Sequence, residues 1–460
     1  MSTITSTVGR VGSRVWGVPA ALYAAIVGYL AVNAPRHAVA LVGAPVLALL
    51  AVNPWWAAAA AAAVLPIQTS VGAGGVQVAG ADVFMLTCFA GMIPLVALQP
   101  GWRAKLAAVK PVLPWITPFL GWLVIVLLVH PSLHSAINTV QYAELTGFAI
   151  VVGAVVLTRQ TARWAMIGFL TVACITAAAW TVHSAAFSVD NKNPAGQFMV
   201  DGLLLSLIVV PKWRWRGPIV LLLILGTLHT ESRGAVLGAG IGGLVLLAFR
   251  GLGSWKRTTA AILPLVLVCI VGYNFVPNSL QARVRSTFSS DKLAVDTSGN
   301  TVAGDLSSGD YTVQIRTIYR HDGIAFVKQH PILGVGVGNY LTGNASLDTL
   351  TNDPHDVLLL NAGEGGLPDM VFFLVMIGGT AFVMLRRRRI SPWAGPALAL
   401  QAAILTHGLV DVYWVRGTPV MGWLLIGMAL NPLLVNKSEP ATDDAATPSA
   451  VPAVPVPVPA

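Results

Sequence analysis

The sequence predicts an all-α integral membrane protein with about 12–14 transmembrane helices, and three observations carry this fold class. Hydrophobic residues make up 55% of the 460 residues. Charged residues make up only 10%, against about 25% in ordinary soluble domains. The mean hydropathy is +0.72, and the apolar residues fall in long runs between short polar connections. Lipid must therefore cover most of this apolar surface.

The apolar runs give the expected helices in order, because a membrane span needs about 20 mostly apolar residues. Several runs are short, and the two that meet at Asn53-Pro54 could form one hairpin. Cys88, Cys174 and Cys269 fall inside runs, where small buried hydrophobic residues are expected instead of disulfides or metal ligands. The candidate spans lie near residues 17–33, 38–52, 54–68, 82–98, 112–129, 140–157, 164–182, 197–210, 217–230, 233–249, 258–275, 368–385, 393–410 and 417–434.

The basic residues predict the orientation. Most lie in clusters that fall on one side of the predicted spans, which the positive-inside rule makes cytoplasmic. Both termini are then cytoplasmic, and the first helix is expected to stay as an anchor. Outside the tail, the acids and all the histidines concentrate on the extracytoplasmic face. The clusters are Arg10/Arg14, Arg103/Lys105/Lys110, Arg159/Arg163, Lys212/Arg214/Arg216, Arg250/Lys256/Arg257, Arg386 to Arg389, and Lys437.

This topology divides the chain into five segments. Residues 1–16 form a cytoplasmic N-terminus and residues 17–276 an N-terminal transmembrane bundle. Residues 277–354 form a large extracytoplasmic loop, in which residues 312–330 have the spacing of an amphipathic helix, with Ile315, Ile318, Ile324, Ala325 and Val327 as its apolar residues. Loops of this length are usually functional. Residues 355–435 supply the C-terminal transmembrane helices, and residues 436–460 a disordered, proline-rich cytoplasmic tail.

Arg233 begins an apolar run at the extracytoplasmic edge. A snorkelling arginine that fixes a helix end is one interpretation. Against it, basic residues are rare on this face, and His229, Glu231 and Ser232 crowd the same turn. A helix N-terminus also presents free backbone N–H groups and a positive dipole end to an anion. Arg233 is therefore a candidate anion-binding residue, with Ser232 in support.

The predicted loop helix carries a second group of basic residues. Arg316 and Arg320 are one turn apart and so share a face, with Lys328 at compatible spacing and His330 close by. They could form an ordinary solvated face. Alternatively, they form a cationic wall that joins Arg233 and holds a pyrophosphate, because guanidinium groups bind phosphate oxygens in pairs.

His355 follows Pro354 and precedes Asp356 at the start of an apolar helix. A single histidine at a helix start is commonly structural. Near these arginines, however, its imidazole could act as a general base near neutral pH and take the proton of an attacking hydroxyl. The arginines would neutralise charge on a departing diphosphate.

Three other features favour structural roles. His130 and His134 are four residues apart, as in metal sites, but no third ligand is evident. Gly334-Val-Gly336-Val-Gly338 lacks the strand–helix context of a phosphate loop. Asp411 could pair with Arg416 near the outer face, with His407 nearby. No metal or other cofactor is therefore expected, and no Asp-x-Asp pair suggests a metal-bound nucleotide sugar.

Three sequence blocks together resemble the O-antigen ligase/polymerase superfamily of membrane glycosyltransferases. Ser232-Arg233-Gly-Ala-Val-Leu237 is similar to the family's Arg-x-x-x-Leu element. Arg316 and the later His330-Pro-Ile-Leu-Gly-Val-Gly-Val-Gly-Asn-Tyr340 are similar to its loop helix and glycine-rich ending. His355-Asp356 with Gly366 is similar to its His-Asn…Gly element, and Asn193-Pro194-Ala-Gly196 is a softer match.

The resemblance implies a GT-C-like enzyme of the inner (cytoplasmic) membrane that acts in surface polysaccharide biosynthesis. It implies a glycan donor on polyprenyl (undecaprenyl) pyrophosphate, and a glycan, lipid or protein acceptor. Transfer would invert the anomeric centre without a metal on the extracytoplasmic face, with Arg233 and Arg316 on the diphosphate and His355 as base. Departures from the family pattern are Arg320 where tryptophan is common, Asp356 for asparagine, and Asp369 for a small residue or tyrosine.

Two rival classes remain. A transporter or flippase for a lipid-linked glycan would place charge near the bilayer midplane, commonly in repeated halves with broken helices. The middles of the predicted spans hold almost no charge, and no repeat is visible. A structural scaffold does not explain arginines on a face that is otherwise poor in basic residues.

The clustering of Lys and Arg between spans favours a lipid bilayer as partner and excludes nucleic acid, despite the net charge of +9.

Overall fold

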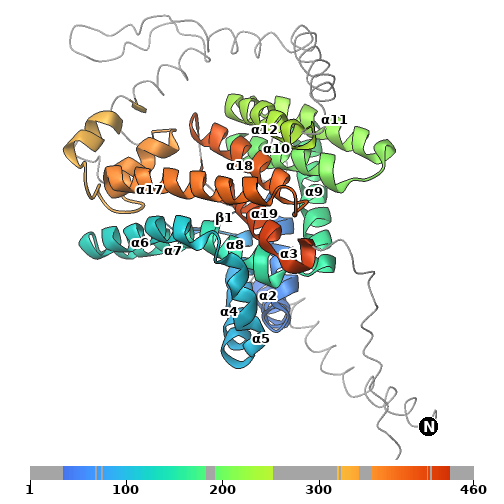
Figure 1. The fold of residues 1–460 in the computed structure, drawn as a ribbon, viewed down its shortest axis with the longest axis horizontal. Coiled ribbons are helices and arrows are strands. Elements are labelled where there is room, and N and C mark those ends of the chain that lie inside the picture. The colour runs from blue at the N-terminus through green and yellow to red at the C-terminus, as the bar shows by residue number, and fades with distance from the viewer. Residues whose placement is uncertain are drawn as a thin grey trace, which may run out of the picture.

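The computed structural model describes residues 35–67, 70–73, 76–182, 192–251, 319–320, 323–340, 354–411, 413–414 and 417–435. The predicted spans near 17–33 and 258–275 lie outside these ranges, as do the segments 1–16 and 436–460. The described residues are helical apart from one short hairpin and the connecting turns. Figure 1 shows α19 (Val420–Leu430) near the middle of the fold, and every residue of this helix is buried.

Every predicted span within the described residues coincides with a helical segment. Several of these helices begin at a proline, where the missing N–H costs nothing because the first helical N–H groups lack partners anyway. The corresponding helices are α2 (Pro35–Ala51), α3 (Pro54–Val64), α4 (Gly80–Leu98), α6 (Leu113–Val129), the run from α7 to η3, α9 (Arg159–Val182), α10 (Lys192–Val209), α11 (Trp213–His229), α12 (Arg233–Gly251), α17 (Val357–Arg387), α18 (Ala394–Gly408) and α19; α5 (Pro100–Lys105), η1 (Leu106–Val109) and α20 (Pro432–Val435) are short.

The described part of the chain is that of a multi-pass membrane protein. Four helical runs there are long and apolar enough to cross a bilayer: α4, Leu133–Val156, α9 and α17. A fifth forms if Pro100–Val109 and Leu113–Val129, bent by 92°, are one broken span. The prediction of 12–14 helices also counted shorter apolar helices such as α3, α12 and α19. Large apolar side chains such as Phe89, Leu128 and Phe382 are exposed, as expected for lipid contact.

A short antiparallel hairpin precedes α4, which the all-helical prediction did not include. Strands β1 (Ser70–Ala73) and β2 (Val76–Ala79) pair with Ser70 opposite Ala79 and Ala73 opposite Val76. Such a register leaves two residues for the turn, and the sequence supplies Gly-Gly there, a pair that tight hairpin turns favour.

The run Leu133–Val156 is an α-helix interrupted by two π-helical turns. It comprises α7 (Leu133–Ala143), η2 (Glu144–Phe148), α8 (Ala149–Val151) and η3 (Val152–Val156). In a π-helical turn each hydrogen bond spans five residues instead of four. Some carbonyl groups next to such turns need other hydrogen-bond partners. The Asn431 side chain donates to Gly153 O (2.9 Å) and Leu157 O (2.8 Å), which joins this run to the end of α19.

Helix α17 is broken at Gly366, whose φ of 79° and ψ of 178° are not helical. The segment 331–338 fills the break with backbone hydrogen bonds: Val335 N to Gly363 O (3.0 Å), Gly336 N to Glu364 O (2.9 Å), and Leu367 N to Pro331 O (2.8 Å). Trp122 Nε1 also donates to Gly365 O (2.7 Å). Irregular backbone at membrane depth requires such internal partners, because lipid offers none.

Helix α12 packs against α18 through glycines four residues apart. Added Cβ atoms at Gly238 and Gly242 would lie 2.7 Å from Ala403 O and 2.9 Å from Ala399 O, and one at Gly234 would overlap the His407 ring. Small residues at this spacing let membrane helices approach closely. The contact fixes the first turn of α12 beside the end of α18, and Figure 1 shows these two helices adjacent.

Only part of the predicted loop helix lies within the described residues. Residues 319–320 and 323–329 are helical, whereas residues 312–318 lie outside the description. Phe326 (1% exposed) and Val327 (8%) face the protein, while Ile324 is 43% exposed. Of the apolar residues that gave this segment its helical spacing, Val327 is thus buried and Ile324 is exposed.

Candidate functional site

His355 stands in a strained turn immediately before α17. Its φ is 49°, in the left-handed region that non-glycine residues rarely adopt. The next residue, Asp356, is the N-cap of α17, and its Oδ1 accepts hydrogen bonds from Leu358 N (2.9 Å) and Leu359 N (3.4 Å). The cap fixes the start of the helix and, with it, the position of the imidazole.

A buried carboxylate lies beside this imidazole. His355 Nδ1 is 3.4 Å from Asp411 Oδ1, with the histidine side chain 26% exposed and the aspartate side chain 1% exposed. The ring of Tyr319 lies on the same histidine, with the two ring centroids 6.0 Å apart. His355 is therefore placed with one ring nitrogen toward a buried carboxyl group.

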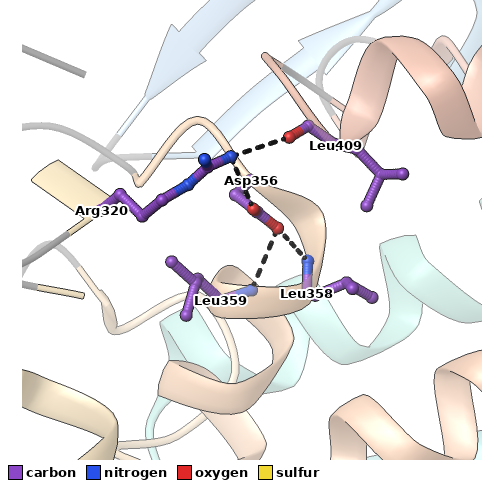
Figure 2. A network of polar contacts seen from close by, with 5 residues as sticks. All are labelled: Arg320, Asp356, Leu358, Leu359 and Leu409. Atoms are coloured by element: carbon purple, nitrogen blue, oxygen red, sulfur yellow. Dashed lines mark hydrogen bonds and ion pairs between the residues drawn. The ribbon is translucent and has the colours of Figure 1, made fainter. Parts of the chain in front are cut away.

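Arg320 connects the loop helix to two other elements, as Figure 2 shows. Its Nη2 donates to Asp356 Oδ2 (3.1 Å) and to Leu409 O (3.3 Å). The arginine side chain is 53% exposed and the aspartate side chain 13%. Because the other oxygen of Asp356 caps α17, one carboxylate joins the loop helix to the α17 start, and the arginine extends the connection to the end of α18.

Arg233 is the first residue of α12, and a second strained residue precedes it. Glu231 has a φ of 52°. Ser232 Oγ accepts from Ala235 N (3.4 Å) in the manner of an N-cap and lies 3.4 Å from His407 Nε2. The N-terminal end of α12 is thus placed by a serine cap and by the last turn of α18.

The segment 407–411, called here the α18 turn, meets all of these groups. His407 contacts Ser232, and Val410 Cγ2 would lie 3.1 Å from a Cβ at Gly234. The Leu409 carbonyl accepts from Arg320, and Asp411 pairs with His355. Four segments that are far apart in sequence therefore converge here. Of the predicted residues, the structure brings Ser232, Arg320 and His355 to this turn. Asp356 is linked to it through Arg320, and Arg233 follows Ser232 at the helix start.

Two predicted residues are not part of this convergence as described. Arg316 lies outside the described residues. His330 is exposed, follows the far end of the loop helix from Arg320, and packs on Phe326 with ring centroids 5.2 Å apart. Ten residues separate it from Arg320, about 15 Å along an α-helix, so the structure does not place it beside His355.

The sequence interpretation gave Asp411 a structural role with Arg416, which lies outside the described residues. Within the described residues, Asp411 lies beside His355, and His407 lies between Ser232 and α10. The sequence did contain a local indication of this site, since His407 and Asp411 lie four residues apart at the end of an otherwise apolar span. Neither its partners nor its proximity to His355 could be read from that spacing.

The remaining candidates pack against protein groups. His134 Nε2 lies 2.8 Å from Gly338 O, and the Gly334–Gly338 amides include two that bond to the broken turn of α17. Within the described ranges, no group of three His, Cys, Asp or Glu side chains is arranged to hold a metal.

One comparison with known families matches this part of the chain. Residues 218–374, from within α11 to within α17, match a family model described as O-antigen ligase. The matched range includes Arg233, Arg316, Arg320 and His355 and ends before the α18 turn. No curated protein matches the chain.

Proposed function

The chain is a member of the O-antigen ligase superfamily, and from this premise we propose that it transfers a glycan from a polyprenyl-pyrophosphate carrier to an extracytoplasmic acceptor. Members of this superfamily are membrane glycosyltransferase-like ligases and polymerases. The observation that supports the proposal most is the convergence on the α18 turn of a histidine–carboxylate pair and the N-terminus of α12 that begins with Arg233.

In the proposed reaction His355 is the base. With Nδ1 paired to Asp411, Nε2 takes the proton from the acceptor hydroxyl as its oxygen attacks the anomeric carbon. A new C–O bond forms on the face opposite the diphosphate, the bond from that carbon to the diphosphate oxygen breaks, and its electron pair stays with the departing polyprenyl diphosphate. The configuration inverts, and the imidazolium returns its proton to water.

The arginines carry the charge that develops on the leaving group. Arg233 and the backbone N–H groups at the start of α12 would offer a positive dipole end to the diphosphate, and Arg316 is proposed to add a second guanidinium group. Arg320 contributes through Nε and Nη1, because its Nη2 already binds Asp356 and Leu409 O. This part of the mechanism needs no metal, since guanidinium groups replace a cation on the diphosphate.

Two supporting roles follow from the same geometry. Ser232 holds the start of α12, and Asp356 holds the start of α17 beside the base. His330 would act only from the far end of the loop helix.

The face of the site is proposed to be extracytoplasmic, with both termini in the cytoplasm and the enzyme in the inner membrane, because the basic clusters lie between spans on the other side.

A lipid-linked glycan transporter is the second candidate, and the structure contains features that suit it. Asp201 in α10 and Asp369 in α17, each near the start of its predicted span, are both 0% exposed. Asp369 also lies close to the helix break at Gly366. Buried acids and broken helices line pathways in transporters.

The deciding experiment is reconstitution of the purified protein in vesicles with an undecaprenyl-pyrophosphate glycan supplied outside. A ligase or polymerase forms a new glycosidic bond and releases undecaprenyl pyrophosphate, both detectable by mass spectrometry. Movement of intact donor across the vesicle without bond formation would establish the transporter. In cells, deletion of the gene separates the enzyme classes: free acceptor accumulates without a ligase, and single-repeat glycans accumulate without a polymerase.

A further inference from the structure

A chain of buried polar groups runs from the end of α18 into α10. His407, Gln197 and Asp201 are each 0% exposed, and Ser232 is 2% exposed. His407 Nδ1 lies 2.8 Å from Gln197 Oε1, and Gln197 Nε2 donates to Asp201 Oδ1 over 2.8 Å. His407 Nε2 lies 3.4 Å from Ser232 Oγ. Burying four polar side chains is costly unless they are paired. Each of these four has a polar neighbour within hydrogen-bond distance, so they form one connected network.

The bonding directions agree with one another. Since the Gln197 amide nitrogen donates to Asp201, its oxygen faces His407, and Nδ1 must carry the proton. In the neutral imidazole Nε2 is then an acceptor for the Ser232 hydroxyl. Ser232 Oγ in turn accepts from Ala235 N in the first turn of α12. The chain therefore ends on the backbone that carries Arg233.

Packing holds the same turn from two sides. A Cβ at Gly234 would overlap the His407 ring, so the imidazole lies directly against the α12 backbone. A Cβ at Gly196 in α10 would lie 2.9 Å from Thr230 Oγ1 and 3.2 Å from Ser232 Cβ. A side chain of ordinary size at either glycine would displace the turn. The start of α12 is consequently set between α10 and the imidazole.

We infer that His407 is a positioning residue that sets the Arg233 turn for the lipid diphosphate through Ser232, an inference that rests on the proposed function. The same α18 turn also contacts Arg320 through Leu409 O and His355 through Asp411. In the α18 turn, His407 thus lies on the side of the proposed diphosphate site, and Asp411 at the other end lies beside the proposed base His355. Its loss displaces Arg233 without touching the acceptor proton transfer.

A purely structural buried histidine would behave differently. In that case any substitution lowers the amount of folded protein, and the affinity for donor in the remaining folded protein is unchanged. Two amide substitutions separate the cases. His407→Asn places its amide near the Nδ1 position, which keeps the bond to Gln197 and loses Ser232. His407→Gln reaches the Nε2 position, which keeps the bond to Ser232 and loses Gln197.

The experiment measures binding of radiolabelled undecaprenyl pyrophosphate to purified full-length protein in nanodiscs, and KM and kcat for transfer. We expect His407→Asn to weaken binding about tenfold and to raise the donor KM by a similar factor, the effect of one lost buried hydrogen bond. His407→Gln stays within about threefold of the unaltered protein. Ser232→Ala reproduces the His407→Asn effect if the asparagine variant does not fold. Melting temperatures monitor folding throughout.

Gln401→Leu is the matched control, because Gln401 lies on the same helix, is 8% exposed, and packs toward Gly422 of α19. It leaves diphosphate binding unchanged. If both His407 variants bind as tightly as the unaltered protein, or lose affinity equally, the positioning role is overturned. Arg233→Ala distinguishes this failure from that of the proposed function: if Arg233→Ala and the unaltered protein bind the lipid diphosphate equally, the donor assignment itself falls and the inference falls with it.

Discussion

At the scale of single residues, the two ends of the candidate site are built in the same way. Glu231 and His355 both have left-handed backbone, and each precedes a capping residue, Ser232 or Asp356, that starts a helix. Such conformations cost about 1–3 kcal/mol each and persist only where neighbouring contacts hold them. At His355 the neighbouring contact is Asp411, so the strain and the pairing occur at one residue.

Replacement of His355 by alanine is expected to abolish glycan transfer while undecaprenyl pyrophosphate still binds. The base acts on the acceptor hydroxyl, and removal of a general base costs about 10²–10⁴ in rate. Parallel measurement of transfer and of diphosphate binding checks this. Donor affinity that falls together with the rate would contradict the assignment of His355 to the acceptor.

Replacement of Asp411 by asparagine is expected to lower kcat, on the order of 10–100-fold, a part of the whole general-base contribution. The amide keeps the shape but removes the charge that would stabilise the imidazolium formed when His355 takes the acceptor proton. Asp369→Asn is the control, since Asp369 is equally buried and packs beside Gly365, not beside His355. Equal effects of the two changes on kcat would show that burial alone, and not the pairing with His355, is responsible.

Arg233→Lys and Arg316→Lys are each expected to raise the donor KM about tenfold or more, because an ammonium group cannot reproduce two parallel bonds to a diphosphate. Arg103→Lys serves as the control, as Arg103 binds the Val96 and Ala97 carbonyls at the end of α4. Near-normal donor kinetics in both test variants would remove the diphosphate clamp.

At the scale of elements, the break in α17 determines where the His355 turn lies. Residues 331–338 fill the break, and their backbone bonds connect the end of the loop helix to the middle of α17. Gly334, Gly336, Gly338 and Gly366 all have positive φ. The glycine-rich motif is therefore explained by close backbone packing against a broken helix, and three of its amides donate to protein carbonyls.

Gly366→Ala is expected to destabilise the protein by at least about 1–3 kcal/mol, since φ is 79° and a Cβ would overlap the Ile332 carbonyl. The measurement is thermal unfolding in detergent. Gly378→Ala lies in the same helix with nothing within 4 Å of an added Cβ, so it should be neutral or stabilise by about 0.5–1 kcal/mol. If the Gly366→Ala and Gly378→Ala variants have the same melting temperature, the break in α17 is not required for stability.

At the scale of the whole molecule, the candidate site is assembled from both halves of the chain. The α12 start comes from the N-terminal helices, the loop supplies Arg320, and α17 and α18 supply His355 and Asp411. The family match ends within α17, so the α18 turn that joins these parts lies beyond it. The proposed site therefore includes a helix that the family model does not cover.

Transfer is expected to continue unchanged after treatment of the purified enzyme with EDTA, because arginine side chains are proposed to neutralise the diphosphate. The check is the transfer rate before and after chelation, and again after addition of Mg²⁺ or Mn²⁺. Loss of activity that a divalent ion restores would overturn the metal-free mechanism.

The sequence by itself determined the membrane class, the positions of the helices within the described residues, and the resemblance to the family. Apolar runs are local, and each predicted span in the described residues coincides with a helical segment because lipid demands a continuous apolar stretch. The motifs around Arg233 and His355 are also local. Only the tertiary structure decided that His355 pairs with Asp411, that Arg320 binds Asp356, and that His407 supports Ser232. These pairs join helices whose facing and depth are set by close packing between remote segments, and no spacing along the chain records that packing.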